Sequence, residues 1–331
     1  MAITVSVVIP TFNRKNFLEK LIQSLLEQSY PKENYEIIVA DDGSTDGTED
    51  LIRQMQKKTA LLKYYRHENR GPSSARNLGI EKSSGTIIGF VDSDVIADRD
   101  WIRNALPYFE DETVMGVEGK TIVPNPQDMT PFTHEAENRK GNNFLSCNIF
   151  YRKTALEKAG GFDERFYDGQ LKVYHRMDSD LAFTILENGG KIPFAPRVLV
   201  RHPAVKARYS KYFKRAAQDG FFEALLSKKH PSSYRKRLKW YDGWAFPVPY
   251  YGYYASLAGL IFALIRTSNA VFLLSILLLA FSHAAALFMV CRKKRVYLKD
   301  FVILLFQFLL IPFLRLYWVL RGSIKFGKLV W

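Results

Sequence analysis

Two groups of carboxylates follow apolar, strand-like runs in the first third of the chain. Asp92-Ser-Asp94 ends one such run, and Asp41-Asp42 ends an earlier one. In an open α/β sheet, ligands bind at the carboxyl ends of the strands. Paired Asp side chains there suit a hard divalent cation, which takes oxygen ligands and often shares them with a substrate phosphate. One Asp-x-Asp alone is more often a turn, but two acidic strand ends favour a site for a phosphorylated ligand.

The elements that would position these acids lie in residues 1–120, where short strand-like runs alternate with amphipathic helical stretches. Strands are predicted at 3–9, 35–40, 61–65 and 86–91. Helices are predicted at 17–26, 46–55 and 73–83, and further along the chain at 153–159 and 179–187. Strands that alternate with helices in this way predict a mostly parallel, doubly wound α/β sheet.

The charge of the chain is strongly positive, because 47 Lys and Arg stand against 33 Asp and Glu, a formal net charge of +14. Such an excess suits nucleic acid, anionic lipid or an acidic ligand. Between Arg208 and Lys239 there are ten Lys or Arg and two acids, directly before the long apolar segments. Basic residues beside a membrane segment are typical of its cytoplasmic flank. The sequence contains no nucleic-acid motif, so we predict membrane lipids rather than nucleic acid as the partner.

Cys147 and Cys291 are the only cysteines and have no metal-type spacing, so neither a disulfide framework nor a zinc site is predicted. The N-terminus runs directly into a strand pattern, without the basic start and apolar run of a cleaved signal peptide. We therefore expect a catalytic domain, residues 1–205, that faces the cytoplasm at the cell membrane.

A basic amphipathic segment, residues 206–243, is expected next. Over residues 209–225, apolar side chains recur on one side of a helix, and Lys211, Lys214 and Arg215 occupy the other side. The basic face and the position before the membrane segments favour a helix that lies in the membrane interface. An ordinary helix packed on the catalytic domain is the alternative.

Residues 244–331 form the predicted membrane region. The runs 244–265 and 270–290 each reach the roughly 20 apolar residues that cross a bilayer, and the short link between them predicts a tight helical hairpin. Aromatic residues at the start of the first run suit an interfacial belt. The third run, 301–320, is interrupted by Pro312 and followed by cations. We predict a re-entrant or interfacial helix there, with a third crossing as the alternative.

Four motifs in a fixed order connect these features. They are Val7-Val-Ile-Pro-Thr-Phe-Asn13, Val39-Ala-Asp-Asp-Gly-Ser-Thr-Asp46, Gly71-Pro-Ser-Ser-Ala-Arg-Asn-Leu-Gly79 and Asp92-Ser-Asp94. Together they resemble the family 2 glycosyltransferases, whose fold is GT-A. The similarity continues through Gly161-Phe-Asp-Glu164 and Asp178-Ser-Asp-Leu181 to His202. Each motif alone has low specificity, whereas the ordered set with this spacing has high specificity.

The resemblance implies a donor site made of Pro10, Phe12, Asn13, Asp41, Asp42, Arg76, Asp92 and Ser93. In the family, the loop after the first strand and the second Asp of the Asp-Asp-Gly motif hold the nucleotide base. A carboxylate at Asp42 can accept a hydrogen bond from a uracil N–H, although turn or capping roles for both acids are open. Arg76 is similar to the family arginine that faces the diphosphate, since a guanidinium fork suits phosphate oxygens. A surface salt bridge is its alternative.

The resemblance also implies a metal site. Asp94 would ligate Mg²⁺ or Mn²⁺, with Asp92 supporting it or contacting the ribose. His202 stands where family members often carry a metal-ligating histidine, and a structural role is its alternative. A cation there would stabilise the negative charge that grows on the departing nucleoside diphosphate.

Asp178 matches the base in the family motif Glu-Asp-x-Asp-Leu, at the start of a predicted helix. Its carboxylate would take the proton from an attacking hydroxyl, and a single displacement then inverts the anomeric carbon. The chain departs from the motif at Met177, where Glu is usual, and at Thr184, where Arg is common. Asp180 is the rival base, and its alternative role is to favour the helix dipole.

These implications describe a membrane-attached glycosyltransferase that moves a sugar from a nucleotide-diphosphate donor, with a UDP-sugar as first candidate. The acceptor would be a hydroxyl of a lipid-linked glycan or a surface polysaccharide. Polyprenyl-phosphate glycosyl transfer is the alternative within this class. Two alternatives belong to other classes. A sugar nucleotidyltransferase is one, but the sequence lacks its Gly-rich loop. A catalytically silent membrane partner is the other, but it would not need the charged residues that the sequence retains.

Three asparagines, Asn142, Asn143 and Asn148, are candidates for the sugar pocket, with ordinary loop roles as the alternative.

Overall fold

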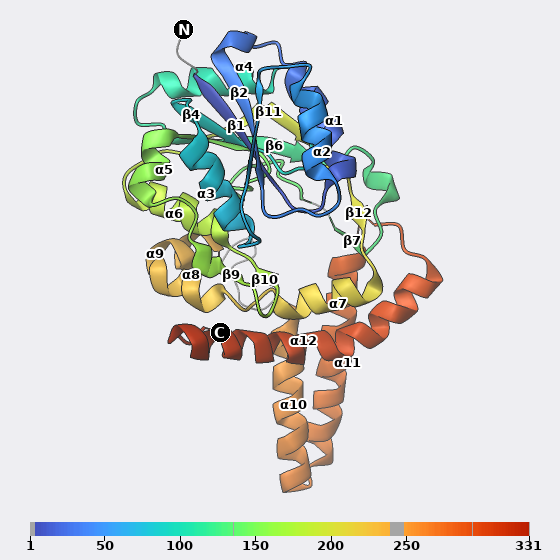
Figure 1. Cartoon of the computed structure of the whole chain (residues 1–331). Coiled ribbons are helices and arrows are strands. Elements are labelled where there is room, and N and C mark those ends of the chain that lie inside the picture. The colour runs from blue at the N-terminus through green and yellow to red at the C-terminus, as the bar shows by residue number, and fades with distance from the viewer. Residues whose placement is uncertain (1–3, 135, 239–247, 293, 331) are drawn as a thin grey trace. The chain divides into compact units, whose positions relative to one another are not determined.

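The computed structural model describes residues 4–134, 136–238, 248–292 and 294–330 (Figure 1). The chain divides into a first unit, residues 1–124 with 135–203, and a second unit, residues 125–134 with 204–331. The first unit holds the acidic strand ends, and the second unit holds the long apolar helices. The segment 125–134 therefore belongs to the second unit, although its sequence position is within the predicted catalytic domain.

An eight-stranded sheet lies at the centre of the first unit, in the order β3-β2-β1-β4-β8-β6-β11-β5. Its strands are β1 (Val5–Thr11), β2 (Tyr35–Asp41), β3 (Leu62–Arg66), β4 (Ile87–Phe90), β5 (Ile96–Ala97), β6 (Gly116–Ile122), β8 (Ile149–Arg152) and β11 (Phe194–Arg201). The four strands from β3 to β4 are parallel, β8 is antiparallel to both of its neighbours, and β6 and β11 are again parallel. The predicted mostly parallel α/β sheet is confirmed.

The α-helices of this unit are α1 (Lys15–Leu26), α2 (Thr48–Gln56), α3 (Pro72–Lys82), α4 (Trp101–Ala105), α5 (Lys153–Ala159) and α6 (Met177–Glu187). In Figure 1, α1 and α2 lie on one side of the sheet and α3 lies on the other. Most of the apolar face of α1 is buried in one cluster with side chains of β1 and β2; its fully buried residues are Leu18, Leu21, Ile22 and Leu25. On the other side, Gly79 of α3 has no room for a Cβ beside Val8 of β1, so helix and strand pack closely.

Short elements complete the first unit. They are the 3-10 helices η1 (Lys32–Asn34), η2 (Leu106–Glu110) and η4 (Glu164–Phe166), and a two-stranded antiparallel pair, β9 (Tyr167–Asp168) and β10 (Val173–Tyr174). This last pair connects η4 to α6.

The second unit is mostly helical. It contains η3 (Pro126–Asp128), the antiparallel pair β7 (Thr133–His134) and β12 (Val205–Lys206), α7 (Tyr209–Gln218), α8 (Glu223–Lys229), α9 (Pro231–Ser233), the π-helix η5 (Tyr234–Leu238), α10 (Val248–Arg266), α11 (Asn269–Cys291) and α12 (Leu298–Phe326). The predicted continuous helix over 209–225 is wrong, because the chain turns between α7 and α8. Gly220 in that turn has no room for a Cβ beside Val319 of α12. The turn is thus set by a long-range contact that local periodicity does not reveal.

Two of the C-terminal helices, α11 and α12, are long and apolar enough to cross a membrane, with mean hydropathies of 2.3 and 2.0. α10 pairs with α11 as a helical hairpin (Figure 1). Gly252 and Gly259 of α10 have no room for a Cβ beside Ser282 and Ser275 of α11, which explains the close packing of this pair. The first predicted span begins at 244, and residues 244–247 lie outside the described residues.

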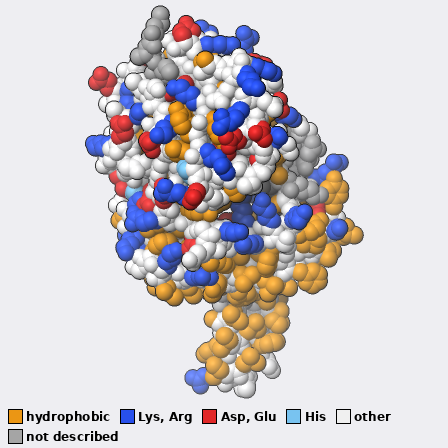
Figure 2. Space-filling view, in the orientation of Figure 1, with side chains coloured by type: hydrophobic (Ala, Val, Ile, Leu, Met, Phe, Trp, Pro, Cys, Tyr) orange, Lys and Arg blue, Asp and Glu red, His pale blue; other side chains and the backbone are white. Residues whose placement is uncertain are grey.

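The third predicted apolar run forms one continuous helix. α12 has 29 residues and contains Pro312 in its interior. In the view of Figure 1 it runs across the axis of the α10–α11 hairpin. Hydrophobic side chains cover the visible face of that hairpin in Figure 2, and large ones such as Leu264 and Phe281 are exposed. Exposed apolar surface of this extent marks a membrane or protein interaction site.

Candidate active site

The loops that follow β1, β2 and β4 meet at one edge of the sheet, because these neighbouring strands are parallel. Thr11 at the end of β1 pairs with Asp41 at the end of β2, and Val8 pairs with Phe90 at the end of β4. The chain leaves β4 and reaches Asp92 two residues later. Both acidic strand ends therefore lie at the same edge, where ligands of open α/β sheets bind.

Asp92, Asp94 and His202 form a cluster that could hold a metal ion, since one ligand atom from each lies within 4.8 Å of the others. His202 Nε2 is 3.5 Å from Asp94 Oδ1. The other ring nitrogen, Nδ1, is 3.1 Å from the Pro203 carbonyl oxygen. With Nδ1–H donating to that carbonyl, Nε2 carries the lone pair that faces the carboxylates. The structure thus brings together the three residues of the predicted metal site.

Two arginines contact these carboxylates. Arg76 Nη2 donates to Asp92 Oδ1 at 2.7 Å, and Arg14 Nη1 donates to Asp94 Oδ2 at 3.1 Å. The Arg76 guanidinium also contacts the Pro72 carbonyl and lies over the Phe162 ring. Its Nε is buried and has no hydrogen-bond partner among the described residues. Arg76 is therefore fixed on Asp92 in the interior of the site, and not in a surface salt bridge.

Asp178 lies in the first turn of α6, after Arg176 in the left-handed conformation (φ 68°). Its Oδ2 accepts from the Ser146 backbone N–H at 3.3 Å. Its Oδ1 is buried and has no hydrogen-bond partner among the described residues, although the residue as a whole is only half-buried. Burial raises the pKa of this carboxyl above its ordinary value; the positive charge of Arg76 opposes the shift and the negative charge of Asp92 adds to it. A carboxylate with raised pKa and a free oxygen is a stronger proton acceptor.

The buried thiol of Cys147 has a pKa that depends on the nearby acids. Burial is the largest cause that raises the pKa of this thiol, and the charges of Asp92, Asp178 and Asp94 raise it further. The thiol thus lies within range of all three carboxylates. The rival base Asp180 is only 2% exposed, whereas Asp178 is half-buried, so Asp178 is the more accessible of the two aspartates of α6.

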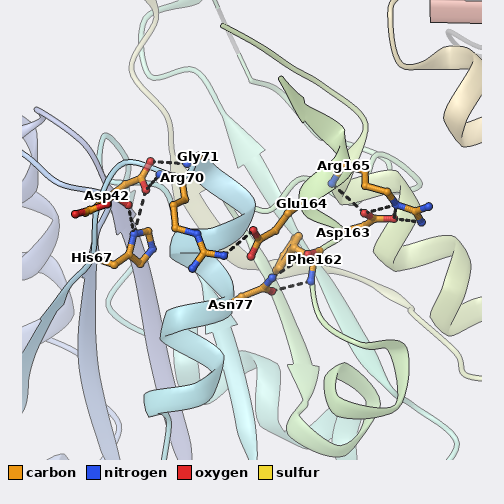
Figure 3. A network of polar contacts seen from close by, with 10 residues as sticks. Asp42, His67, Arg70, Gly71, Asn77, Phe162, Asp163, Glu164 and Arg165 are labelled. Carbon is orange, nitrogen blue, oxygen red and sulfur yellow. Dashed lines mark hydrogen bonds and ion pairs between the residues drawn. The ribbon is translucent and has the colours of Figure 1, made fainter. Parts of the chain in front are cut away.

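At the other end of the edge, Asp41 and Asp42 are buried and accept hydrogen bonds at both oxygens. Asp41 accepts from the Ser44 N–H at 2.8 Å and from the Tyr64 hydroxyl at 2.6 Å. Asp42 accepts from the N–H groups of Arg70 at 2.8 Å and Gly71 at 2.9 Å. His67 Nδ1 lies 3.4 Å from the Asp42 carboxylate (Figure 3). Burial raises the pKa of Asp42 in spite of these donors. Both acids shape turns, and Asp42 keeps lone pairs for a further donor.

The loop after β1 is tied to the loop after β2 through Asn13. Its N–H donates to Ser44 Oγ, and its side-chain oxygen accepts from the Thr45 N–H, each at 2.8 Å. The preceding Phe12 is 44% exposed, so its ring is available for stacking on a base. Of the other residues implied for the donor site, Pro10 is half-buried and Ser93 is buried.

A second polar network joins α3 to the segment that leads toward α6 (Figure 3). Asn77 of α3 exchanges two hydrogen bonds with the backbone of Phe162, at 2.8 and 2.9 Å. Arg70 forms an ion pair with Glu164 at 3.2 Å. Hydrogen bonds and an ion pair therefore join the loop that Asp42 organises, α3 and the segment before α6.

Two residues of the site were missed by reasoning from the sequence. Arg14 directly follows the motif that ends at Asn13, but no pattern in the sequence predicts its ion pair with Asp94, 80 positions away. Glu118 of β6 is buried and accepts from the backbone N–H groups of Asn142 at 2.7 Å and Asn143 at 2.8 Å. It thereby fixes the loop that carries Ser146 to Asp178. No periodicity or motif marks Glu118.

The three asparagines that were candidates for the sugar pocket separate. Asn142 and Asn143 have exposed side chains. Asn148 is buried; its Oδ1 accepts from Trp101 Nε1 at 2.8 Å, and its Nδ2 donates to two backbone carbonyls. Asn148 is thus a brace of the core, because all of its polar atoms are used there.

Comparison with known proteins assigns the family. Residues 6–180 match the family model described as glycosyl transferase family 2. The chain belongs to this family. It is 30% identical over 210 residues to "Glycosyltransferase AglE" of Haloferax volcanii, which covers 60% of this chain and 67% of that protein. Other matching glycosyltransferases, from Rickettsia species, are longer, and the chain spans 15–17% of their length.

A second relative is the "Dolichyl N-acetyl-alpha-D-glucosaminyl phosphate 3-beta-D-2,3-diacetamido-2,3-dideoxy-beta-D-glucuronosyltransferase" of Methanococcus voltae. It is 25% identical over 246 residues, which covers 68% of this chain and 74% of that protein. Among solved structures, mannosyltransferase PcManGT from Pyrobaculum calidifontis, in complex with GDP-Man and Mn²⁺, superposes with a TM-score of 0.64 and 21% identity. The superposition covers 99% of this chain and 88% of that one. The first unit of this family 2 member therefore has the GT-A fold.

Proposed function

We propose that this glycosyltransferase is an inverting, metal-dependent enzyme that transfers a sugar from a UDP-sugar to a hydroxyl of a lipid-linked or polysaccharide glycan at the membrane. The observation that carries the proposal is the cluster of Asp92, Asp94 and His202 at the edge of the sheet where β1 and β2 end. Arg76 links this cluster to α6, because it donates to Asp92 and lies 3.7 Å from Sδ of Met177, which precedes Asp178. Family membership supports glycosyl transfer, and the Methanococcus voltae relative acts, by its name, on a dolichyl-linked sugar.

Asp178 is proposed as the general base. Its free Oδ1 takes the proton from the acceptor hydroxyl as that oxygen bonds to the anomeric carbon. The bond between the anomeric carbon and the diphosphate oxygen breaks on the opposite side, and the nucleoside diphosphate leaves. One displacement of this kind inverts the anomeric configuration. The raised pKa of Asp178 supports this role, since the ordinary Asp pKa is far below neutral pH.

Asp92, Asp94 and His202 are proposed as the residues that hold a divalent cation. When bound, the cation would act as a Lewis acid on the diphosphate and stabilise the charge of the leaving group. Two carboxylates and one imidazole fit Mn²⁺ better than Mg²⁺, because Mg²⁺ favours oxygen ligands alone. Arg76 holds Asp92 in place and adds positive charge to the same region.

The nucleotide base is proposed to stack on Phe12 and to donate to Asp42. The framework around Asp42 is rigid, which is suitable for selecting one base by hydrogen bonding. A UDP-sugar is the first candidate and a GDP-sugar is the second, because the neighbour PcManGT was solved with GDP-Man.

The second unit is proposed to attach the enzyme to the cytoplasmic side of the membrane. Residues 204–331 contain 21 Lys or Arg against four acids, whereas residues 1–203 contain 26 against 29. The positive charge of the chain thus gathers around the apolar helices, where it attracts anionic lipid head groups. We infer that the α10–α11 hairpin crosses the bilayer and that α12, across its axis in Figure 1, lies in the interface. A crossing by α12 is the alternative.

An acceptor and donor screen with the full chain in nanodiscs tests this function. UDP-sugars and GDP-mannose are offered with lipid-linked oligosaccharides or with bare polyprenyl phosphate, and the released nucleotide and the anomeric configuration are measured. We expect nucleoside diphosphate, dependence on Mn²⁺ and an inverted product on the oligosaccharide. Transfer only to polyprenyl phosphate would support the alternative acceptor. Failure to release nucleoside diphosphate from any of the offered donors would reject glycosyl transfer by this chain.

A further inference from the structure

Asp94 is engaged at both of its oxygens by groups of different kinds. Oδ1 faces the Nε2 lone pair of His202 at 3.5 Å, and Oδ2 accepts from the Arg14 guanidinium at 3.1 Å. A divalent cation held by Asp92, Asp94 and His202 would draw on the same carboxylate. The Arg14 guanidinium is itself a cation, so it and the metal compete for Asp94.

The two arginines of the site differ in how firmly they are held. The Arg76 side chain is 7% exposed and is fixed by Asp92, by a backbone carbonyl and by the Phe162 ring. The Arg14 side chain is 42% exposed and, apart from Asp94, lies over the ring of Phe17, 5.7 Å from its centroid. Arg14 can therefore leave its carboxylate at low free-energy cost, and Arg76 cannot.

Arg14 lies between the proposed metal site and the proposed site of the nucleotide base. It directly follows Phe12 and Asn13 in the loop after β1, and Asn13 is bonded to the loop after β2. Its guanidinium reaches Asp94 across the edge of the sheet. Arg14 therefore lies between the two places that a nucleotide diphosphate would join, a base at Phe12 and a cation at Asp94. A guanidinium fork matches phosphate oxygens in charge and shape.

We propose that Arg14 couples the binding of the metal to the binding of the nucleotide. Its guanidinium pairs with Asp94 until the cation and the donor bind. The guanidinium then leaves Asp94 and pairs with the diphosphate. The proposal rests on the proposed function, because it needs a nucleotide-diphosphate donor and a divalent cation at this site. It assigns Arg14 a positioning role that has opposite effects on two ligands: it weakens the binding of the metal alone and strengthens the binding of the nucleotide.

Binding measurements on the full chain in nanodiscs test the two effects separately. Mn²⁺ affinity is measured by electron paramagnetic resonance without nucleotide, and UDP and GDP affinities are measured by calorimetry with saturating Mn²⁺. For Arg14→Gln we expect Mn²⁺ alone to bind about three- to tenfold more tightly, because a competing positive charge is removed. We expect the nucleotide that the wild type prefers to bind about tenfold more weakly, because a charge-assisted contact is lost.

Two further variants complete the test. Arg14→Lys keeps the charge without the fork, and we expect both affinities between those of the wild type and Arg14→Gln. Arg53→Gln, which removes an exposed arginine paired with Glu49, serves as the matched control and should change neither. Unchanged or weaker Mn²⁺ binding by Arg14→Gln would overturn the coupling role while leaving the proposed function intact. If the wild type binds no Mn²⁺ even with nucleotide, both proposals fail.

Discussion

The acids at the two ends of this site differ in their partners. The acids at the end of β2, Asp41 and Asp42, accept from backbone N–H groups and one tyrosine hydroxyl, and Asp42 also lies 3.4 Å from His67 Nδ1. The acids at the other end, Asp92, Asp94 and Asp178, have different partners. Asp92 and Asp94 accept from arginine side chains. Asp178 accepts from the Ser146 N–H at Oδ2, and its Oδ1 has no hydrogen-bond partner among the described residues.

The difference separates acids that build the site from acids that can react in it. A carboxylate that accepts from backbone donors at both oxygens holds a loop in one conformation and does not exchange these partners easily. A carboxylate paired with a mobile arginine or left partly unpaired can accept a metal or a proton. In the proposed function the same residue type serves as framework at one end and as chemical group at the other, so substitutions at the two ends should affect different quantities.

The largest effect is expected for Asp178→Asn. An amide cannot take a proton from the acceptor hydroxyl, so the transfer rate should fall about 10²- to 10⁴-fold while UDP affinity stays unchanged. Initial rates of nucleoside diphosphate release and calorimetric UDP binding measure the two quantities. Asp180→Asn is the comparison, and we expect it to retain more activity. The base assignment would move to Asp180 if that variant were inactive and Asp178→Asn were not.

Next in size is Asp94→Asn, which should weaken Mn²⁺ binding by about 100-fold. Loss of a residue that binds the metal directly should cost at least as much affinity as loss of a residue that only holds a metal ligand in place. Donor affinity should fall with it. Mn²⁺ titration followed by electron paramagnetic resonance is the measurement. Asp98→Asn, which removes a surface acid paired with Arg201 at 3.4 Å, is the control. Equal loss in both variants would mean that Asp94 has no special role.

Asp42→Asn should act on stability more than on metal binding. The asparagine NH₂ would face one of the two N–H groups from which Asp42 now accepts a hydrogen bond. The buried donor left unpaired would lower the free energy of unfolding by about 1–3 kcal/mol. Thermal unfolding in nanodiscs should therefore shift down by several degrees, a change not expected for Asp94→Asn. An unchanged unfolding temperature would contradict the framework role.

The smallest effect concerns pH and Asp178. Because the pKa of this group is raised in the folded protein, its stability contribution is fully present below its unfolded pKa and is lost as pH rises through the folded pKa. Asp178→Asn should thus unfold at a slightly higher temperature than the wild type at neutral pH, with the difference disappearing in acid. In the wild type, transfer should fall with decreasing pH at a midpoint above the ordinary Asp value of 3.8. A lower melting temperature for the variant at neutral pH would contradict the sign.

The sequence was sufficient for the parallel half of the sheet and for three residues, Asp92, Asp94 and His202, that the structure brings together. The helix of 153–159 was predicted to the residue, and the strands ending at Asp41 and before Asp92 were found within one or two residues. These features are local: they depend on periodicity and on polar residues at strand ends. The family resemblance then supplied His202 and Asp178.

The mixed half of the sheet could not be predicted, because its pairing is non-local. β6 contains Gly116 and Gly119 and a buried glutamate, so it shows no alternation. A Cβ at Gly119 would collide with Asn148, a contact that exists only after β6 and β8 have paired. The Arg14–Asp94 pair and the Ser146–Asp178 hydrogen bond likewise depend on the assembled fold.

The allocation of residues 125–134 to the second unit has a practical consequence for preparing a water-soluble fragment. Phe132 of that segment is fully buried, with its ring centroid 4.5 Å from that of Tyr209 and 5.0 Å from that of Tyr212. The backbone of Met129 is also bonded to Arg295, between α11 and α12. Truncation at residue 205 would remove all of these partners and expose the apolar side chains of residues 125–134 on the excised domain, which would promote aggregation. A better-behaved fragment would replace 125–134 with a short polar linker before the anchor is cut away.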